Sequence, residues 1–183
     1  EYDFGSRLSS VPTTAPYRFQ WEGINALISG RIDRVDVDQE RNFIVYDYKL
    51  GESLTAKELV EVAKIQIPVY ILALEQLIFG ADKAVGGCYL SLNNSSRAKG
   101  GIWQQAKIEP VIKSKAVLTP FEWKEWLQQI CQEVARAIKG IREGNYKTVI
   151  SCLPYCEYQS CCRRQELFHA VAEVNEPNAV CAE

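Results

Sequence analysis

Two segments of the chain, residues 26–37 and 43–50, carry closely spaced apolar side chains and are rich in Val, Ile, Phe and Tyr. These residue types favour β-strands, and the polar run 38–42 between the two segments suits a hairpin loop. The pattern therefore predicts an antiparallel pair of strands.

A hairpin loop symmetric about Glu40 fixes which residues face each other. The opposed pairs are then Val37 with Phe43, Val35 with Val45, and Asp33 with Asp47. Facing carboxylates have Cβ atoms about 4.5 to 5.5 Å apart, which destabilises a sheet unless a cation neutralises them. Because side chains alternate along a strand, Lys49 points to the same side as Asp47. This register predicts two carboxylates and one ammonium group converging on one spot.

The chemistry of these groups favours a hard cation. Carboxylate oxygens suit Mg²⁺ or Mn²⁺, and Mg²⁺ commonly uses one or two protein carboxylates together with waters and phosphate oxygens. Such a site fits phosphodiester hydrolysis, with Lys49 orienting a water molecule or offsetting developing negative charge. The alternative is a non-catalytic set of charges, with Asp33 and Asp36 paired to Arg31 and Arg34, and Asp47 and Lys49 on a solvated face.

The remaining strands are predicted from shorter patterns. Residues 1–16 are rich in Ser, Thr and Pro and predict an irregular segment, whereas residues 17–21 predict a strand that turns at Glu22–Gly23. Residues 85–92 and 102–111 predict two further strands.

Two capping boxes mark helix starts. The first, Thr55–Glu58, predicts a helix that reaches Phe79 with a kink at Pro68. The second, Thr119–Glu122, opens a helix that ends near Gly144. Its core-facing stripe is Trp123, Trp126, Leu127, Ile130, Val134, Ala137, Ile138 and Ile141.

The composition agrees with one soluble domain, since 47% of the 183 residues are hydrophobic and 24% are charged. A formal net charge of −2 means that any DNA contact must use local basic patches. The candidates are Arg97, Lys99 and Lys107, and separately Lys113 with Lys115, although a solvated loop explains them at least as well. Without a signal peptide or a bilayer-length apolar run, we expect a cytoplasmic protein with no membrane partner.

Three motifs occur in a fixed order: Gly-x-Ile-Asp-Arg-Val-Asp at 30–36, Asp-Tyr-Lys at 47–49 and Gln-x-x-x-Tyr at 66–70. Together they resemble the PD-(D/E)XK nuclease superfamily, in particular its RecB-like branch. The resemblance covers residues 17–164 and leaves 165–183 as a tail. It implies an α/β fold of restriction-endonuclease-like type, with a mixed central sheet flanked by helices.

The resemblance also implies a role for each motif residue. Asp33 and Asp47 are the expected ligands of Mg²⁺ or Mn²⁺, the backbone carbonyl of Tyr48 completes the metal shell, and Lys49 is the catalytic lysine. Gln66 and Tyr70 position the substrate and support the lysine. One departure is that the further acidic residue or His, usually found on a helix upstream, has no counterpart before residue 17. The single histidine, His169, lies near the other end of the sequence.

Four cysteines fall close together at Cys152, Cys156, Cys161 and Cys162. In a cytosolic protein such a cluster favours Zn²⁺ or an iron–sulfur cluster over disulfides. By resemblance to AddB-like members of the branch, Cys152, Cys156 and Cys162 join one upstream cysteine around a [4Fe-4S] cluster, with Cys161 as a possible substitute for Cys162. No cysteine of this sequence matches the upstream one. The other three, Cys88, Cys131 and Cys181, are expected to be packed or exposed bystanders.

The resulting expectation is a DNA exonuclease module of a helicase–nuclease complex that resects double-strand breaks for recombination. Its partners are DNA and a helicase subunit or a fused helicase-like region, in a longer parent protein. Three alternatives remain: a CRISPR-adaptation nuclease with an iron–sulfur cluster, a catalytically inactive DNA-binding or scaffold module with the nuclease fold, and a structural zinc module built on the cysteines.

Overall fold

The computed structural model describes residues 1–5, 14–50, 64–92, 101–108 and 116–145. Contacts divide the chain into two units, residues 1–143 and 144–183, and all the elements given below belong to the first. In chain order they are β1 (Tyr2–Phe4), β2 (Tyr17–Trp21), β3 (Ile24–Ile28), β4 (Gly30–Ile32), β5 (Arg34–Val37), β6 (Phe43–Lys49), α2 (Gln66–Leu74), a π-helical turn (Glu75–Phe79), β7 (Ala84–Ser91), β8 (Gly101–Gln104), a 3-10 turn (Gln105–Lys107), β9 (Val117–Leu118) and α3 (Pro120–Arg142).

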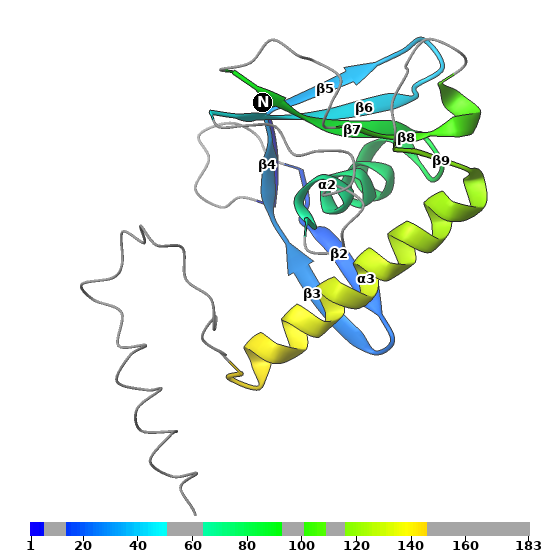
Figure 1. Ribbon diagram of the computed structural model, residues 1–183. Helices are drawn as coiled ribbons and strands as arrows, with labels where there is room; N and C mark the ends of the chain where they lie inside the picture. The colour runs from blue at the N-terminus through cyan, green and yellow to red at the C-terminus, as the bar shows by residue number, and fades with distance from the viewer. Residues whose placement is uncertain (6–13, 51–63, 93–100, 109–115, 146–183) are drawn as a thin grey trace, which may run out of the picture. The chain divides into compact units, whose positions relative to one another are not determined.

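A five-stranded mixed sheet in the order β5-β6-β7-β8-β9 forms the centre of this unit (Figure 1). The pairs β6–β7 and β8–β9 are parallel, whereas β5–β6 and β7–β8 are antiparallel. Parallel neighbours require a crossover connection, and α2 lies within the one between β6 and β7. The mixed sheet with its helices confirms the predicted α/β class.

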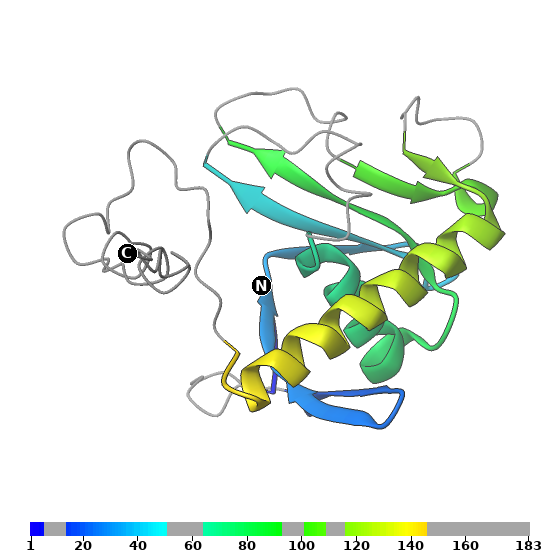
Figure 2. The ribbon, with the colours of Figure 1, turned by 60° about the horizontal axis from the view of Figure 1, so that its bottom comes forward.

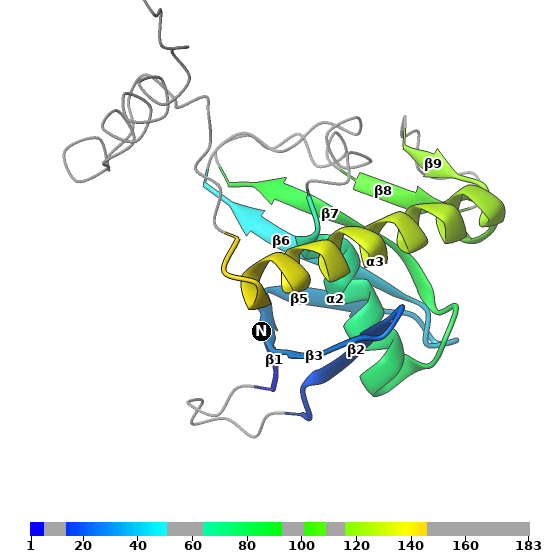
Figure 3. The same cartoon turned by 90° about the horizontal axis from the view of Figure 1, so that it is seen from below.

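Helices α2 and α3 lie on the same side of this sheet, with the β2–β3 hairpin on the far side of the helices (Figures 1 and 2). The view from below shows α3 running across α2 (Figure 3). Large apolar side chains fill the space between these layers, among them Phe4, Phe19, Phe43, Ile67, Ile71, Leu74, Ile102 and Ile130. None of the described helices is long and apolar enough to span a membrane.

The predicted hairpin between β5 and β6 is confirmed, and its register is confirmed for the two predicted pairs next to the loop. Val37 lies opposite Phe43, and Val35 lies opposite Val45. The loop is held by Asp38, whose Oδ1 accepts two backbone N–H groups at 2.9 and 2.7 Å. Because the Asp38 side chain bonds to the backbone of its own turn, the start of β6 is fixed, and so are the positions of the residues that follow.

The single long strand predicted over residues 26–37 is wrong. The extended segment is instead interrupted at Ser29 and at Asp33, which divides it into β3, β4 and β5; these strands pair with β2, β1 and β6 respectively. Close packing accompanies the interruptions, since a Cβ atom on Gly30 would lie 2.8 Å from Cζ of Phe4. The apolar pattern showed the extended conformation correctly but could not show that the partner strand changes twice.

Two further expectations also need correction. Residues 1–16 are not wholly irregular, because Tyr2–Phe4 forms β1 and the Phe4 side chain is fully buried. The strand expected over 102–111 ends at Gln104 and continues as a 3-10 turn. Of these segments, residues 6–13 and 109–111 lie outside the described part of the chain.

Helix α2 begins later than predicted, because Lys64 and Ile65 are not helical. Pro68 is therefore the third residue of the helix, where a backbone N–H would have no partner within the helix. The predicted interruption of the helix at Pro68 is wrong. The helix passes into the π-helical turn and stops at Gly80, which has a φ of 87°. The predicted end at Phe79 is confirmed, whereas the capping box at 55–58 lies outside the described residues.

Helix α3 begins with the predicted capping box. The Thr119 hydroxyl accepts the N–H of Glu122 at 3.3 Å, and the Glu122 carboxylate accepts the N–H of Thr119 at 2.8 Å. The apolar stripe is buried at Trp123, Trp126, Ile130 and Val134 and partly buried at Leu127 and Ile138, but Ala137 and Ile141 are exposed. The stripe therefore holds for most of α3 and fails in its last turns.

Candidate active site

The candidate site lies where the inner face of β6 meets the first turn of α2. Alternation along β6 places Val45, Asp47 and Lys49 on the side that faces α2. Helix α2 approaches the sheet closely there, because a Cβ atom on Gly87 of β7 would lie 2.5 Å from Cγ2 of Ile67. Gln66, the first residue of α2, is thereby brought beside Asp47.

Four side chains form a connected polar network. The Lys49 Nζ lies 2.6 Å from Oδ2 of Asp47 and donates to Oε1 of Gln66 at 3.1 Å. The Gln66 Nε2 in turn donates to Oδ1 of Asp47 at 2.8 Å and to the hydroxyl of Tyr70 at 3.1 Å. The structure thus brings together Asp47, Lys49, Gln66 and Tyr70, four of the residues singled out from the sequence.

Asp47 is the buried charge of this network, since it is only 4% exposed. A buried carboxylate is costly unless it is paired and hydrogen-bonded, and here Lys49 supplies the charge while Gln66 supplies a hydrogen bond. The buried Oδ2 of Asp47 accepts no hydrogen bond of acceptable geometry. The expectation that Asp47 lies on a solvated face is therefore excluded.

Asp33 occupies a different position from the one the symmetric register implied. The β5–β6 ladder begins at Arg34 opposite Tyr46, and Asp33 lies at the bend just before it. Its Oδ2 accepts the backbone N–H of Tyr48 at 2.8 Å. Asp33 is thus anchored to the β6 backbone beside the network and is not a ladder partner of Asp47.

These residues fit a hard cation in their donor chemistry. The candidate donors are the carboxylates of Asp33 and Asp47 and the carbonyl of Tyr48, all oxygen atoms, and Oδ2 of Asp47 has capacity to spare. Among the described residues no group of three His, Cys, Asp or Glu side chains is placed to hold a metal. Mg²⁺ does not require such a group, because it retains waters and uses substrate phosphate oxygens.

The neighbouring acidic residue Asp36 has a structural partner. Arg34 donates to both of its carboxylate oxygens at 2.7 Å, on the face of the sheet opposite Asp47. Arg31 pairs with Asp3 of β1 at 2.7 Å and not with Asp33. The salt-bridge alternative is therefore correct for Asp36 and wrong for Asp33.

Tyr89 was missed by the sequence reasoning, although it lies in direct contact with the network. It stands opposite Asp47 in the parallel register of β6 and β7. The Lys49 Nζ lies 5.2 Å from the centroid of the Tyr89 ring, and the Tyr89 hydroxyl donates to Oε1 of Gln66 at 3.5 Å. Burial, with a further contribution from the Asp47 charge, raises the pKa of Tyr89 to about 12. The register of two parallel strands depends on the crossover that connects them, so the local sequence pattern could not predict that Tyr89 lies beside Asp47.

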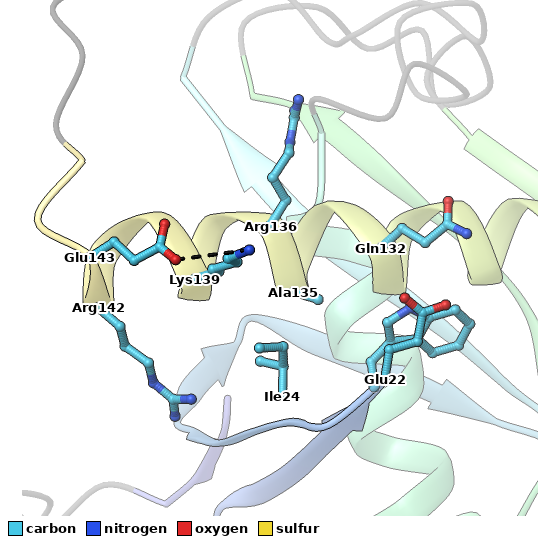
Figure 4. A pocket seen from close by; sticks show the side chains of 9 residues that line it. Glu22, Ile24, Gln132, Ala135, Arg136, Lys139, Arg142 and Glu143 are labelled. Atoms are coloured by element: carbon cyan, nitrogen blue, oxygen red, sulfur yellow. Dashed lines mark ion pairs between the residues drawn. The ribbon is translucent and has the colours of Figure 1, made fainter.

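A groove of about 540 Å³ between α3 and the β2–β3 hairpin includes none of these residues (Figure 4). Its cations already have partners: Arg136 pairs with Glu133, Lys139 lies 3.8 Å from Glu143, and Arg142 donates to the carbonyl of Asn25. Two of its three cations are thus paired with carboxylates, whereas the partner of Arg142 is a neutral carbonyl, which leaves the charge of Arg142 in place.

The other predicted groups are accounted for as far as the described residues allow. Lys107 is held by the carbonyl and carboxylate of Asp82 and by the carbonyl of Ala84, so it is not an open DNA contact. Cys88 is buried and Cys131 partly buried, both as free thiols, as expected, and burial raises the pKa of Cys88 to about 12. The cysteine cluster, Cys181, His169, Arg97, Lys99, Lys113 and Lys115 lie outside the described residues.

Comparison with curated proteins and with solved structures gave no match. Comparison with protein families shows that residues 3–163 match the PD-(D/E)XK nuclease superfamily. That range contains the mixed sheet, α2 and the whole polar network around Asp47. The chain belongs to the PD-(D/E)XK nuclease superfamily.

Proposed function

We propose that the protein is a Mg²⁺- or Mn²⁺-dependent deoxyribonuclease whose cleavage site contains Asp33, Asp47, Lys49, Gln66 and Tyr70. Membership of the superfamily implies a nuclease, and a nuclease binds its nucleic acid. The observation that carries the proposal is the almost fully buried carboxylate of Asp47, held by Lys49 and Gln66 at the end of a central strand. Burial of a charge at this cost favours a functional site over a structural one.

Each side chain has a defined task in this proposal. A bound Mg²⁺ or Mn²⁺ ion supplies Lewis acidity to the scissile phosphate and lowers the pKa of a water molecule. Asp47, Asp33 and the Tyr48 carbonyl offer the oxygens that hold the ion. Lys49 presents an ammonium group that offsets negative charge growing on the phosphate. Gln66 and Tyr70 fix the direction of Lys49 and Asp47 from the helix side.

The finer assignment is to the RecB-like branch, as an AddB-like exonuclease module that works with a helicase in resecting double-strand breaks. Its support is the order and spacing of the three motifs, with the Gln66 and Tyr70 pair following Asp-Tyr-Lys. On this assignment the nuclease domain spans residues 17–164, preceded by residues 1–16 and followed by a tail at 165–183. A CRISPR-adaptation nuclease has the same motifs and remains the alternative within the branch.

The cysteines extend the proposal to a second cofactor. Cys152, Cys156 and Cys162, or Cys161 in place of the last, hold a [4Fe-4S] cluster together with the further upstream cysteine that the AddB-like resemblance implies. The support is spacing alone, because these residues lie outside the described part of the chain. Anaerobic purification of the full-length protein, followed by measurement of its iron, zinc and sulfide content, tests this proposal. Equal iron and sulfide supports the cluster, whereas zinc without sulfide indicates a structural zinc site.

One observation favours a competing function, a nuclease-fold module that binds DNA without cutting it. Within residues 1–5, 14–50, 64–92, 101–108 and 116–145, no third acidic or His side chain joins Asp33 and Asp47. The intact pairing of Asp47 with Lys49 argues for cleavage instead, since a binding module has no use for a buried carboxylate in that place.

Cleavage of linear single- and double-stranded DNA with Mg²⁺, Mn²⁺ or EDTA separates the two functions. The variants are Asp47→Asn and Lys49→Ala, and the control is Asp36→Asn, because Asp36 faces the opposite side of the sheet. We expect metal-dependent cleavage that both site variants lose by at least about 10²-fold and that the control retains. Metal-independent binding without cleavage would instead establish the non-catalytic module.

A further inference from the structure

The geometry points to Tyr89 as a positioning residue that fixes Lys49 and Gln66 in one arrangement beside Asp47. This inference rests on the proposed function, because it concerns the same cleavage site. Tyr89 is not part of the three sequence motifs, and its position follows from the β6–β7 register alone.

Tyr89 reaches the network from the strand next to β6. It lies opposite Asp47 in the parallel ladder, on the side of the sheet that packs against α2, and it is only 4% exposed. A side chain this well enclosed has a fixed rotamer and little access to a DNA substrate. Its influence on the reaction therefore passes through the residues that it touches.

The first of these is Lys49, whose long and flexible side chain is 42% exposed. The centroid of the Tyr89 ring lies 5.2 Å from the Lys49 Nζ, within the range of a cation–π contact. The Asp47 carboxylate and the Gln66 carbonyl oxygen attract the same ammonium group. The aromatic ring thus supports Lys49 in addition to its two oxygen partners and limits the directions that its stem can adopt.

The second is Gln66, whose amide must be oriented correctly to serve both neighbours. Its Oε1 accepts from Lys49 at 3.1 Å and from the Tyr89 hydroxyl at 3.5 Å, while its Nε2 donates to Asp47. A flipped amide would turn its NH₂ group toward two donors and its oxygen toward a carboxylate. The hydroxyl of Tyr89 donates to Oε1, which favours the observed orientation of the amide.

The variants that test this role are Tyr89→Phe, which keeps the ring and removes the hydroxyl, and Tyr89→Leu, which removes both. Tyr17 provides matched controls, Tyr17→Phe and Tyr17→Leu, because it is also buried but packs against Phe19 of β2. All are made in the full chain and compared with Lys49→Ala and wild type for kcat and KM on linear DNA at saturating Mn²⁺.

We expect Tyr89→Leu to lower kcat about 10-fold, from the cation–π contact and the lost amide orientation, with KM within about twofold of wild type. The kcat of Tyr89→Phe should lie between those of Tyr89→Leu and wild type, because the retained ring keeps the contact with Lys49. The Tyr17 variants leave both constants unchanged. A rise in KM alone, or equal losses in the Tyr17 and Tyr89 series, would overturn the positioning role.

A second measurement does not depend on cleavage. The side-chain amide resonances of Gln66, assigned by their loss in Gln66→Ala, should shift or broaden in Tyr89→Leu and remain in place in Tyr17→Leu. Resonances unmoved in Tyr89→Leu would refute the inference whether or not the protein cuts DNA. Conversely, a wild-type protein that does not cleave DNA, or a fully active Lys49→Ala variant, counts against the proposed function even if the Gln66 resonances respond.

Discussion

Lys49 and Asp47 point to the same side of β6, and the Lys49 Nζ lies 2.6 Å from Oδ2 of the Asp47 carboxylate. One partner is enclosed by protein and the other reaches water. In the absence of any other cation, Lys49 is therefore the counter-charge of Asp47. Removal of the Lys49 charge should therefore affect stability differently from removal of the Asp47 charge.

We predict that Lys49→Ala lowers the free energy of unfolding by about 1 to 3 kcal/mol, because it leaves a buried carboxylate with only the Gln66 hydrogen bond. Asp47→Asn should leave this free energy unchanged or higher, since it removes the buried charge and keeps an acceptor for Gln66. Urea denaturation of both variants measures the difference. Equal losses in the two variants would mean that the carboxylate is not the costly member of the pair.

Metal binding provides a second prediction. Mg²⁺ or Mn²⁺ at about 100 times its Kd should stabilise the fold by about 2.7 kcal/mol, which raises Tm by roughly 5 to 10 °C for a chain of this size. Asp47→Asn and Asp33→Asn should abolish the shift in thermal melts, because each loses an expected ligand. Asp36→Asn is the control and should retain it, since Asp36 is paired with Arg34. A shift that survives in Asp33→Asn would remove Asp33 from the proposed ligand set.

The pH dependence of stability provides a third prediction through Glu75. Burial raises the pKa of this carboxyl, although its Oε1 accepts the N–H groups of Lys83 and Ala84 at 3.0 and 3.2 Å. A raised folded-state pKa means that the contribution to stability is present below the unfolded value and is lost as pH rises through the folded value. Glu75→Gln should therefore be more stable than wild type at neutral pH, with the difference shrinking in acid.

Glu122 provides the opposite case and serves as the control for Glu75. Its hydrogen bonds with Thr119 lower the pKa of the Glu122 carboxyl, so its contribution is present above the unfolded value and disappears as pH falls through the folded value. Glu122→Gln should then be less stable than wild type at neutral pH. Unfolding free energies measured from neutral to acid pH test both signs, and the same sign in both variants would contradict the assignment.

A fourth prediction concerns packing on the outer face of the sheet. A Cβ atom on Gly86 would lie 2.7 Å from Cε3 of Trp103, so Gly86→Ala should cost about 1 to 3 kcal/mol of stability. Gly80→Ala, at a φ of 87° with no neighbour within 4 Å of the added methyl, isolates the backbone cost of about 1 kcal/mol. Chemical denaturation should rank Gly86→Ala as the more damaging substitution.

Local pattern was sufficient for some parts of this fold and insufficient for others. The β5–β6 register followed from the length of a polar loop, and the start of α3 followed from the reciprocal hydrogen bonds of a capping box. Both are determined by residues close in sequence. Gln66 and Tyr70 are likewise four residues apart on one helical turn, so their contact could be foreseen.

Features that depend on distant partners could not be foreseen. The bend at Asp33 reflects a change of partner from β1 to β6, and β1 itself was hidden in a segment of Ser, Thr and Pro. Tyr89 reaches the site only because the β6–β7 crossover sets a particular parallel register. These are tertiary choices made among strands with similar apolar patterns.

The division of residues 24–37 among three ladders has a consequence for local opening. Asp47 lies in β6, which pairs with β7 along its whole length and with β5 as far as Tyr46, so its release requires that the β6–β7 ladder come apart. Asp33 lies between β4, whose partner is the three-residue β1, and β5, which is the outermost strand of the sheet among the described residues. Amide hydrogen exchange should therefore be slower at Tyr46 and Asp47 than on the β4 side of Asp33. Such a difference would mean that the two carboxylates proposed to share one ion are held by parts of the protein that open at different free energies.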